Sequence, residues 1–390
     1  MAETAAHLVD HVLPHVPIRQ WVLTFPFRIR YLIAFDSDLS ARLRRIFVRT
    51  VFNWLRKQGR DLGVAEPEAG AVVFLQRWNS ALNLAPHLHG LFLDGIYAPG
   101  DLFSPPVWHS LSEPTDEDVA EILWRVRDRV MKLLHLRGLL PEDDIQSDER
   151  LPFDSPSLGA CYAASVQGRV GLGEASGKRV QRVGYQKDAP YVAFTGKRCA
   201  ELEGFTLHAG TRIDGHDRNS LERLCRYVAR PPIAQDRLSL LPDGRVSYRL
   251  KRPWNDGTTA VVFRPLEFIE KLAALVPPPH SNLVSYHGVF APNATLRSEV
   301  VPGSSGKRLQ GTRCPEGEDL EEVPASERRR RINWAELLMR VFLVDILKCD
   351  CGGRRRVIAL LTDPPVVRAI LDCLDLPTDP PPITPARWPP

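Results

Sequence analysis

The sequence has no long hydrophobic run, no signal peptide and no strong charge of one sign. No apolar stretch approaches the roughly 20 residues that cross a bilayer, and the opening MAETAAHLVDHVLPHVP has neither the basic-then-apolar order of a signal peptide nor the arginine-rich composition of a transit sequence. The formal net charge of +4 is too small by itself to require a nucleic-acid partner. Seven scattered cysteines favour a reducing compartment over a disulfide framework. We therefore expect a cytoplasmic protein with no membrane partner.

The sequence does contain enough apolar residues for a full-sized core. Hydrophobic residues make up 44% of the 390 positions, which predicts two or three folded units. The order of the expected elements predicts an α+β fold, a ferredoxin-like βαββαβ core with an antiparallel sheet and one extra helix. Strands are expected where apolar residues alternate or run together, at 18–27, 71–78, 86–94 and 204–213. Helices are expected where they recur every three or four positions, at 37–58, 116–137 and 217–230.

Composition divides the rest of the chain. Strands are expected around RVSYRL and AVVFRPL, followed by a helix at LEFIEKLAAL, whereas the stretch that ends in ERRRR is polar and rich in Gly and Glu. Cys349 and Cys351, with the distant Cys314 and Cys373, do not make a recognisable zinc site. The predicted division is a nuclease core at 1–137 and 203–235, an insertion at 138–202, an accessory DNA-binding region at 236–300, a linker at 301–331, a helical region at 332–376 and a disordered tail at 377–390.

Two histidines lie side by side in the predicted strand PHLHGLFLD. In a ferredoxin-like sheet this third strand is central, so both of its faces are covered. His87 and His89 share one face with Leu91 and Leu93, and adjacent side chains on one face lie about 6.5 Å apart along a strand. Two neutral imidazoles at this spacing can converge on one divalent metal ion. The alternative is that each imidazole forms a hydrogen bond to nearby backbone.

A tyrosine flanked by arginines lies near the end of the predicted helix 217–230, which Asp217 caps and Pro231 must end. Tyr227 is at the edge of the apolar stripe of this helix, and Arg223 and Arg230 lie four residues before it and three after it. Guanidinium groups match phosphate oxygens and can hold a phosphodiester beside the tyrosine hydroxyl. The alternative, a boundary tyrosine on a solvated basic helix, is favoured by this segment alone.

Several segments in order, QRWNSALNLAPHLHGLFLDG, GFTLHAGTRIDGHDRNSLERLCRYVARPPIA, YRLKRPWNDGTT and LVSYHGVFAPNATLR, resemble the bacterial two-tyrosine insertion-sequence transposases. This family is a branch of the His-hydrophobe-His (HUH) endonuclease superfamily, and the resemblance extends over about residues 1–300. It implies a rolling-circle transposase that nicks and rejoins single-stranded DNA at element ends and target. It also implies that His87 and His89 bind Mg²⁺ or Mn²⁺ and that Tyr227 is the nucleophile, which forms a 5′-phosphotyrosine.

Further site residues follow from the same comparison. HUH sites usually add a polar third ligand, and Gln76 is the first candidate because it lies on the hairpin partner strand and its amide oxygen suits a hard cation. Backbone pairing by Gln76 is an equal alternative, and His208 ranks lower because the first strand separates its strand from the third. Basic and aromatic residues suited to phosphate binding and base stacking are the expected DNA contacts, namely Arg223, Arg230, Lys251, Arg252, Trp254 and His287.

The sequence departs from the family pattern at two places. Pro231 stands where a second catalytic tyrosine would follow one helical turn after the first, so a single-tyrosine mechanism is implied. Tyr248 and Tyr286 are too far along the chain to be assumed as substitutes. The family pattern also places a cysteine-rich zinc-binding module ahead of the segment MAETAAHLVDHVLP, with which the printed sequence begins. Without that module, we expect salt-dependent binding of single-stranded DNA and a weak preference for element ends.

Other functions remain as alternatives. A TIM-barrel metallohydrolase with a His-x-His strand needs eight βα units and further metal ligands, and the sequence has no pattern for them. A catalytically inactive DNA-binding remnant of a transposase, or a related plasmid replication initiator or relaxase, would keep the same segments. No pattern encodes the DNA sequences or the oligomeric state. Metal-dependent cleavage of single-stranded DNA separates the active enzymes from the remnant.

Overall fold

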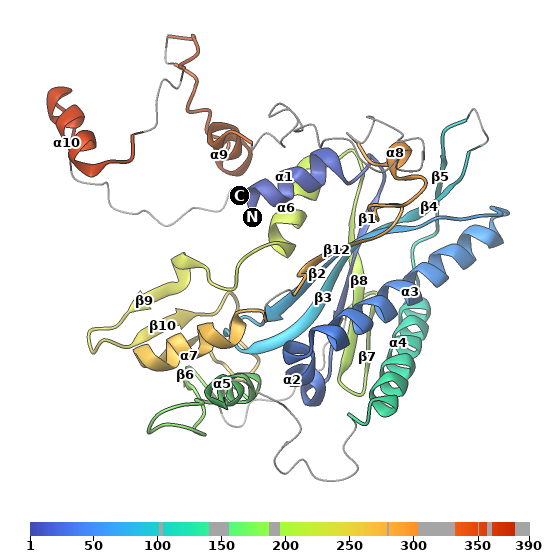
Figure 1. Cartoon of the computed structure of the whole chain (residues 1–390), viewed down its shortest axis with the longest axis horizontal. Helices are drawn as coiled ribbons and strands as arrows, with labels where there is room; N and C mark the ends of the chain where they lie inside the picture. Colours follow the sequence, from blue (N-terminus) through green and yellow to red (C-terminus); the bar gives the residue numbers. More distant parts are fainter. Residues whose placement is uncertain are drawn as a thin grey trace, which may run out of the picture. The chain divides into compact units, whose positions relative to one another are not determined.

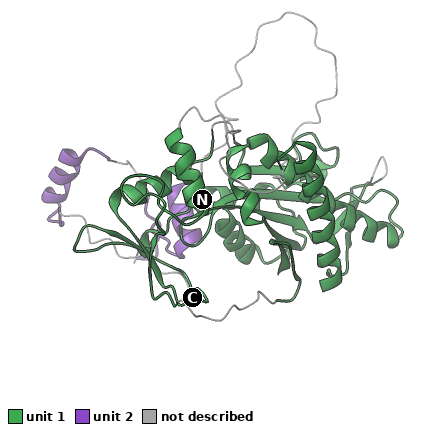
Figure 2. Ribbon diagram, turned by 90° about the horizontal axis from the view of Figure 1, so that it is seen from below, with its two compact units in different colours: residues 1, 3–310 green, residues 2, 311–390 purple. Residues whose placement is uncertain are grey.

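A computed structural model gives the fold of the chain in two compact units, one comprising Met1 and residues 3–310 and the other Ala2 and residues 311–390 (Figure 2). The predicted linker and tail lie outside the described residues, except for the first two positions of each. No helix within the described ranges is long and apolar enough to cross a bilayer. The structure describes residues 1–100, 104–139, 156–186, 196–278, 281–302, 332–349, 351–356 and 361–378.

The larger unit is built on a six-stranded antiparallel sheet with the strand order β12-β2-β3-β1-β8-β7 (Figure 1). Its four central strands are the four that the sequence predicts, in the spatial order of a ferredoxin-like fold. The α+β prediction is therefore confirmed, and β3 is covered on both faces as expected, since Leu88 and Phe92 pack into one core and Leu91 and Leu93 into another. The strands are β1 (Ile18–Thr24), β2 (Gly70–Trp78), β3 (Leu84–Leu93), β7 (Cys199–Leu202), β8 (Phe205–Ile213) and β12 (Val284–Gly288).

Successive side chains along each strand point to opposite faces of the sheet. Residues such as Trp21, Leu88 and Phe92 point to one face and are buried against three helices. The side chain of Asp36 accepts a hydrogen bond from the backbone N–H of Leu39 and so caps the longest of these helices. Figure 1 shows these helices together on one side of the sheet. They are α2 (Phe27–Phe35), α3 (Ser37–Asp61) and α4 (Asp116–Leu136).

The opposite face packs against α1 (Ala2–His11), which the sequence reasoning did not predict, and α6 (Arg218–Val228). Asp217 caps α6 as predicted, since its carboxylate accepts from the backbone N–H of Ser220 at 3.0 Å. The helix ends two residues before the predicted limit of 230. Pro231 explains this difference, because a proline disfavours the helical conformation of the residue before it.

A second sheet carries the accessory region, with the strand order β6-β11-β10-β9. The strands and helix expected around RVSYRL, AVVFRPL and LEFIEKLAAL are confirmed there as β10, β11 and α7. The predicted insertion contributes to both sheets, because β7 pairs with β8 and β6 pairs with β11. The elements are α5 (Pro156–Val166), β6 (Gln181–Val183), β9 (Leu238–Leu240), β10 (Val246–Arg249), β11 (Ala260–Phe263) and α7 (Pro265–Leu275).

The remaining elements are short. A hairpin of β4 (Gly95–Ala98) and β5 (Val107–Ser110) follows β3, and α8 (Arg297–Val300) follows β12. In the smaller unit the helix expected at INWAELLMRVFLVDIL extends only over α9 (Trp334–Phe342). It ends where Leu343 adopts a left-handed conformation with φ of 57°, which breaks the helical hydrogen-bond pattern. The smaller unit also contains α10 (Pro364–Cys373).

A buried ion pair ties three central strands together. Arg19 on β1 is 1% exposed, and its Nε lies 2.6 Å from an oxygen of Asp94, which directly follows β3. The same carboxylate accepts from Arg212 Nε on β8 at 2.9 Å, and Arg19 Nη1 donates to the carbonyl of Ala209 at 3.0 Å. Glu113, whose carboxylate lies 3.3 Å from Nη2 of Arg19, is half exposed. Removing Asp94 would therefore leave the buried guanidinium less well compensated.

We therefore expect Asp94→Ala to lower the free energy of unfolding by about 3 kcal/mol, measured by urea denaturation. Glu121→Ala is the matched control, because the pair of Glu121 with Arg125 on α4 is half exposed and one helical turn apart, and such pairs contribute little. Equal losses in the two variants would show that the Arg19–Asp94 pair does not stabilise the sheet.

Candidate active site

The two histidines of β3 lie beside each other on the sheet face that α6 covers. His87 is directly opposite Gln76 of β2, and His89 is directly opposite Phe74. The centroids of the two imidazole rings are 4.9 Å apart. The residues next along this face, Leu91 and Leu93, belong to the core under α1 and α6. The prediction that these four side chains share one face is confirmed.

Hydrogen bonding determines which nitrogen of His87 is free. Nδ1 of His87 lies 2.8 Å from the carbonyl oxygen of Ala85. Because a carbonyl only accepts, Nδ1 must carry the hydrogen, and the neutral ring then has its lone pair on Nε2. His87 thus forms the hydrogen bond to nearby backbone that the alternative to metal binding predicts. This bond still leaves Nε2 of His87 free to bind a metal ion.

Gln20 of β1 is a site residue that the sequence reasoning missed. Its side-chain amide lies 2.9 Å from Nδ1 of His89, and both residues are buried. The facing atom is the amide nitrogen, which donates to Nδ1 and places the ring hydrogen on Nε2. Turning the amide, so that its oxygen accepts from Nδ1–H, is what would leave Nε2 of His89 with its lone pair. The signal in the sequence is a polar residue in the otherwise apolar strand IRQWVLT, two positions before Val22, which pairs with His89.

Both imidazoles are uncharged at neutral pH. Burial lowers the pKa of His87 to about 4, and the nearby positive charges of Arg230 and Arg30 act in the same direction. Burial also places the pKa of His89 well below its ordinary value, and His87 and Arg230 lower this pKa further. Neutral imidazoles are the form that donates a lone pair to a cation.

Tyr227 of α6 lies over this pair. Its ring centroid is 5.8 Å from that of His89, with the two planes at 85°. The tyrosine is 37% exposed, so its ring is open to solvent on one part of its surface. The guanidinium carbon of Arg230 lies 4.4 Å from the ring centroid, and Nζ of Lys251 lies 5.9 Å from it. The tertiary structure therefore brings together residues of the predicted strand 86–94, the predicted helix 217–230 and the accessory region, namely His87, His89, Tyr227, Arg230 and Lys251.

Gln76 connects the histidine strand to the end of α6. Its amide nitrogen donates to the carbonyl of Val228 at 2.8 Å and lies 3.5 Å from the carbonyl of Tyr227. In a continuing helix the N–H of residue 232 would occupy the Val228 carbonyl, but Pro232 has no N–H. This is the backbone pairing that the sequence left open for Gln76, and it makes Gln76 a positioning residue for Tyr227. Its role as a metal ligand stays a prediction.

The other predicted contacts divide between this site and other surfaces. Arg230 lies beyond the end of α6 and stacks on Tyr227, whereas Arg223 donates to the hydroxyl of Ser220 at 2.8 Å within the helix. Arg252 follows Lys251 in an exposed turn. His208 is on β8, with β1 between it and the histidine strand, as the sequence reasoning expected.

His287 lies on the other face of the sheet. It is opposite Ala71 of β2, whose side chain packs into the core under α3. There it borders a hollow of about 330 Å³ with Arg45 and Arg49, and burial lowers its pKa to about 4. His287 is therefore not part of the arrangement around Tyr227.

The donor set at the histidine pair can be compared with what a metal ion needs. Within the described parts of the chain, no three residues of the types His, Cys, Asp and Glu gather into a metal cluster. On the adjacent strands, the described polar residues nearest the pair are Gln20 and Thr24 of β1 and Gln76 of β2. Two neutral imidazoles fit a hard divalent cation that keeps its other positions for water or phosphate oxygens.

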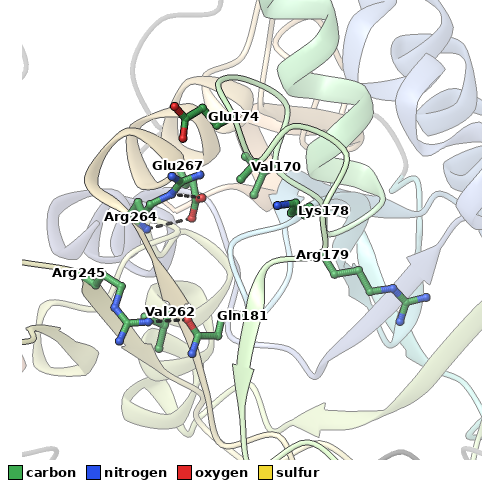
Figure 3. Close-up of a pocket in the computed structure, with 10 residues that line it drawn as sticks. Val170, Glu174, Lys178, Arg179, Gln181, Arg245, Val262, Arg264 and Glu267 are labelled. Atoms are coloured by element: carbon green, nitrogen blue, oxygen red, sulfur yellow. Dashed lines mark hydrogen bonds and ion pairs between the residues drawn. The ribbon is translucent and has the colours of Figure 1, made fainter. Parts of the chain in front are cut away.

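A second hollow of about 330 Å³ lies in the accessory region, between β6, β11 and α7 (Figure 3). Two of its arginines are already paired, Arg245 with the amide oxygen of Gln181 and Arg264 with Glu267. In Figure 3, Arg179 extends away from these pairs. None of the lining residues belongs to the group around Tyr227, so this hollow carries no part of the candidate chemistry.

Residues 70–298 match the model of a protein family described as "Putative transposase" (Y2_Tnp). This match covers more than half of the chain. The chain belongs to this transposase family. The matched region contains His87, His89 and Tyr227, and the family implies a DNA-cleaving enzyme of transposition, which is a form of DNA recombination. No curated protein and no solved structure matches the transposase.

The low pKa of the histidine pair predicts a pH dependence of stability. Unfolding returns the pKa of His87 from about 4 toward 6.5, so the unfolded state binds more protons between these values, and stability falls as the pH is lowered through this window. We expect His87→Gln/His89→Gln to lose less unfolding free energy than the wild type between pH 7 and pH 4.5, measured by urea denaturation in EDTA. His11→Gln, at an exposed position of α1, is the control. Equal pH slopes for wild type and double variant would contradict the prediction.

Proposed function

We propose that the transposase nicks and rejoins single-stranded DNA by a rolling-circle mechanism of the HUH type, through a 5′-phosphotyrosine at Tyr227. One observation carries this proposal. Tyr227 lies 5.8 Å, ring to ring, from His89 of the paired histidines, although the two residues come from a helix and a strand far apart in the sequence. A nucleophile beside two neutral imidazoles is an arrangement that metal-assisted phosphoryl transfer can use.

The chemistry at Tyr227 is a transesterification. The phenolic oxygen attacks phosphorus, a P–O bond to tyrosine forms, and the bond from phosphorus to the 3′ oxygen breaks. The phenolic proton leaves to solvent, and the departing oxygen takes up a proton and becomes a free 3′-hydroxyl. Because the new ester conserves the bond energy, a 3′-hydroxyl can attack it in the reverse direction and rejoin the strand without ATP.

The chain's own groups prepare this reaction. Mg²⁺ or Mn²⁺ held by His87 and His89, with Gln76 as a proposed third ligand, would polarise the scissile phosphate and stabilise charge in the transition state. Arg230 and Lys251, both beside the Tyr227 ring, provide positive charge for the incoming phosphate. Arg223 and Arg252 are proposed as outer phosphate contacts.

The structure supports a single nucleophile. Tyr248 is fully buried, and its hydroxyl donates to the carbonyl of Pro232 at 3.3 Å. Tyr286 is on β12, and β2 separates its strand from the histidine strand. Neither residue lies beside the histidines, so exchange between two tyrosines on one helix is not part of the proposal.

We expect Tyr227→Phe to abolish the covalent adduct while it leaves DNA affinity nearly unchanged, because only the attacking oxygen is lost. The test incubates the full chain with Mn²⁺ and a single-stranded oligonucleotide that spans the element's own ends. A 3′-labelled strand should become attached to the protein, whereas a 5′-labelled strand should be released in shortened form. Tyr286→Phe, the control, should form the adduct. An adduct in Tyr227→Phe would place the nucleophile elsewhere, and an inactive DNA-binding remnant would form no adduct at all.

We expect His87→Ala and His89→Ala each to remove Mn²⁺-dependent cleavage and to weaken Mn²⁺ binding, measured by calorimetry without DNA. His208→Ala is the matched control, because His208 is a histidine of the same sheet with β1 between it and the pair. If both variants bind Mn²⁺ with the affinity of the wild type, the histidine pair is not the metal site.

A further inference from the structure

Arg182 lies between two aromatic rings at the edge of the accessory sheet. Its guanidinium carbon is 5.3 Å from the ring centroid of Tyr185 and 5.2 Å from that of Trp254. Nη1 of Arg182 also lies 3.0 Å from a carboxylate oxygen of Asp256. Tyr185 is 47% exposed. The three stacked side chains, Tyr185, Arg182 and Trp254, are called the stacking cluster below.

The stacking cluster is connected to the group around Tyr227. Trp254 lies in the turn between β10 and β11, and Lys251 of the same turn reaches within 5.9 Å of the Tyr227 ring. Three residues span at most about 10 Å of chain, so Trp254 belongs to the same short turn as the lysine that reaches Tyr227. Trp254 Nε1 also donates to the hydroxyl of Ser80, in the turn that joins β2 to the histidine strand, at 3.3 Å.

The turn that carries both features is held by its own backbone. The N–H of Leu250 donates to the carbonyl of Thr259 at 2.8 Å, and the N–H of Trp254 donates to that of Thr258 at 2.9 Å. Gly257 has a positive φ of 79°, a conformation that glycine adopts without strain, and its N–H donates back to Trp254. The spacing between Lys251 and Trp254 is therefore fixed before any ligand binds.

We propose that the stacking cluster is a base-stacking platform for single-stranded DNA, on the same turn as the lysine that reaches Tyr227. Aromatic faces and guanidinium planes both stack on nucleobases, and every base has such a face, so the platform would hold a strand with little sequence preference. The identity of the ligand rests on the proposed function. Because Asp256 neutralises the charge of Arg182, the cluster contacts bases. Lys251 and Arg230 then provide the positive charge that binds the phosphates.

This separation of roles gives the platform a distinct experimental signature. A stacking contact disappears when the base is removed but does not depend on salt, whereas a phosphate contact weakens with salt and does not depend on the base. A cluster that only stabilises the fold would change neither property. Binding to DNA with and without bases therefore distinguishes the three cases.

The experiment uses the full chain with Tyr227→Phe in EDTA, so that binding is measured without cleavage. The probes are a fluorescein-labelled single-stranded oligonucleotide and the same backbone with abasic residues. Base removal should weaken binding to this protein by about 5- to 150-fold for each stacked base. When Tyr185→Ala or Trp254→Ala is combined with Tyr227→Phe, binding to the normal oligonucleotide should weaken by a similar factor. Removal of the bases should then weaken binding little further. The salt dependence of binding should not change in either variant.

Matched variants complete the test. Trp124→Ala removes a 57% exposed tryptophan of α4, on the other side of the main sheet, and should leave the effect of base removal unchanged. Tyr185→Phe should keep the effect of base removal. Lys251→Ala should also keep this effect, but it should lower the slope of log affinity against log salt concentration by about one. The proposal is refuted if base removal weakens DNA binding by the same factor in Tyr185→Ala and Trp254→Ala as in the parent protein. Absence of an adduct in the wild type would refute the cleavage mechanism alone.

Discussion

One buried hydrogen bond, from the amide of Gln76 to the carbonyl of Val228, fixes α6, which carries the proposed nucleophile, over the histidine strand. Pro232 leaves that carbonyl without its helical donor, and an unsatisfied buried carbonyl costs about 1–3 kcal/mol. The end of α6 is therefore stable where Gln76 can donate to it, and Gln76 lies directly opposite His87 in the sheet. Packing of Leu221 and Cys225 into the core adds to this placement. The position of Tyr227 is a consequence of these contacts.

The electrostatics of the site follow from where the charges lie and not from how many there are. The net charge of +4 is small, yet Arg230 and Lys251 both lie beside the tyrosine ring. Burial keeps the two imidazoles neutral, and the nearby arginine makes their protonation still less favourable. The result is positive charge beside two neutral imidazoles, an arrangement that suits the proposed binding of a phosphate.

Sequence reasoning succeeded where the determining interactions are local. The period of two in PHLHGLFLD correctly placed His87 and His89 on one face, and Asp217 caps α6 as predicted. It failed for Gln20 and for the Arg182 stack, because these contacts join segments that are far apart in the chain. It also named His287 as a DNA contact without giving its position, and only the pairing of β12 shows that this side chain lies on the sheet face opposite to Tyr227.

The sequence by itself determined the order of the core elements, the shared face of the histidines and the stop at Pro231. Each of these depends on backbone geometry within a few residues, which periodicity, capping groups and proline control directly. Only the tertiary structure decided that Gln76 holds the end of α6 and that Lys251 reaches Tyr227. Contacts of this kind depend on how elements far apart in the chain pack to bury their apolar faces, and no local sequence pattern encodes that packing.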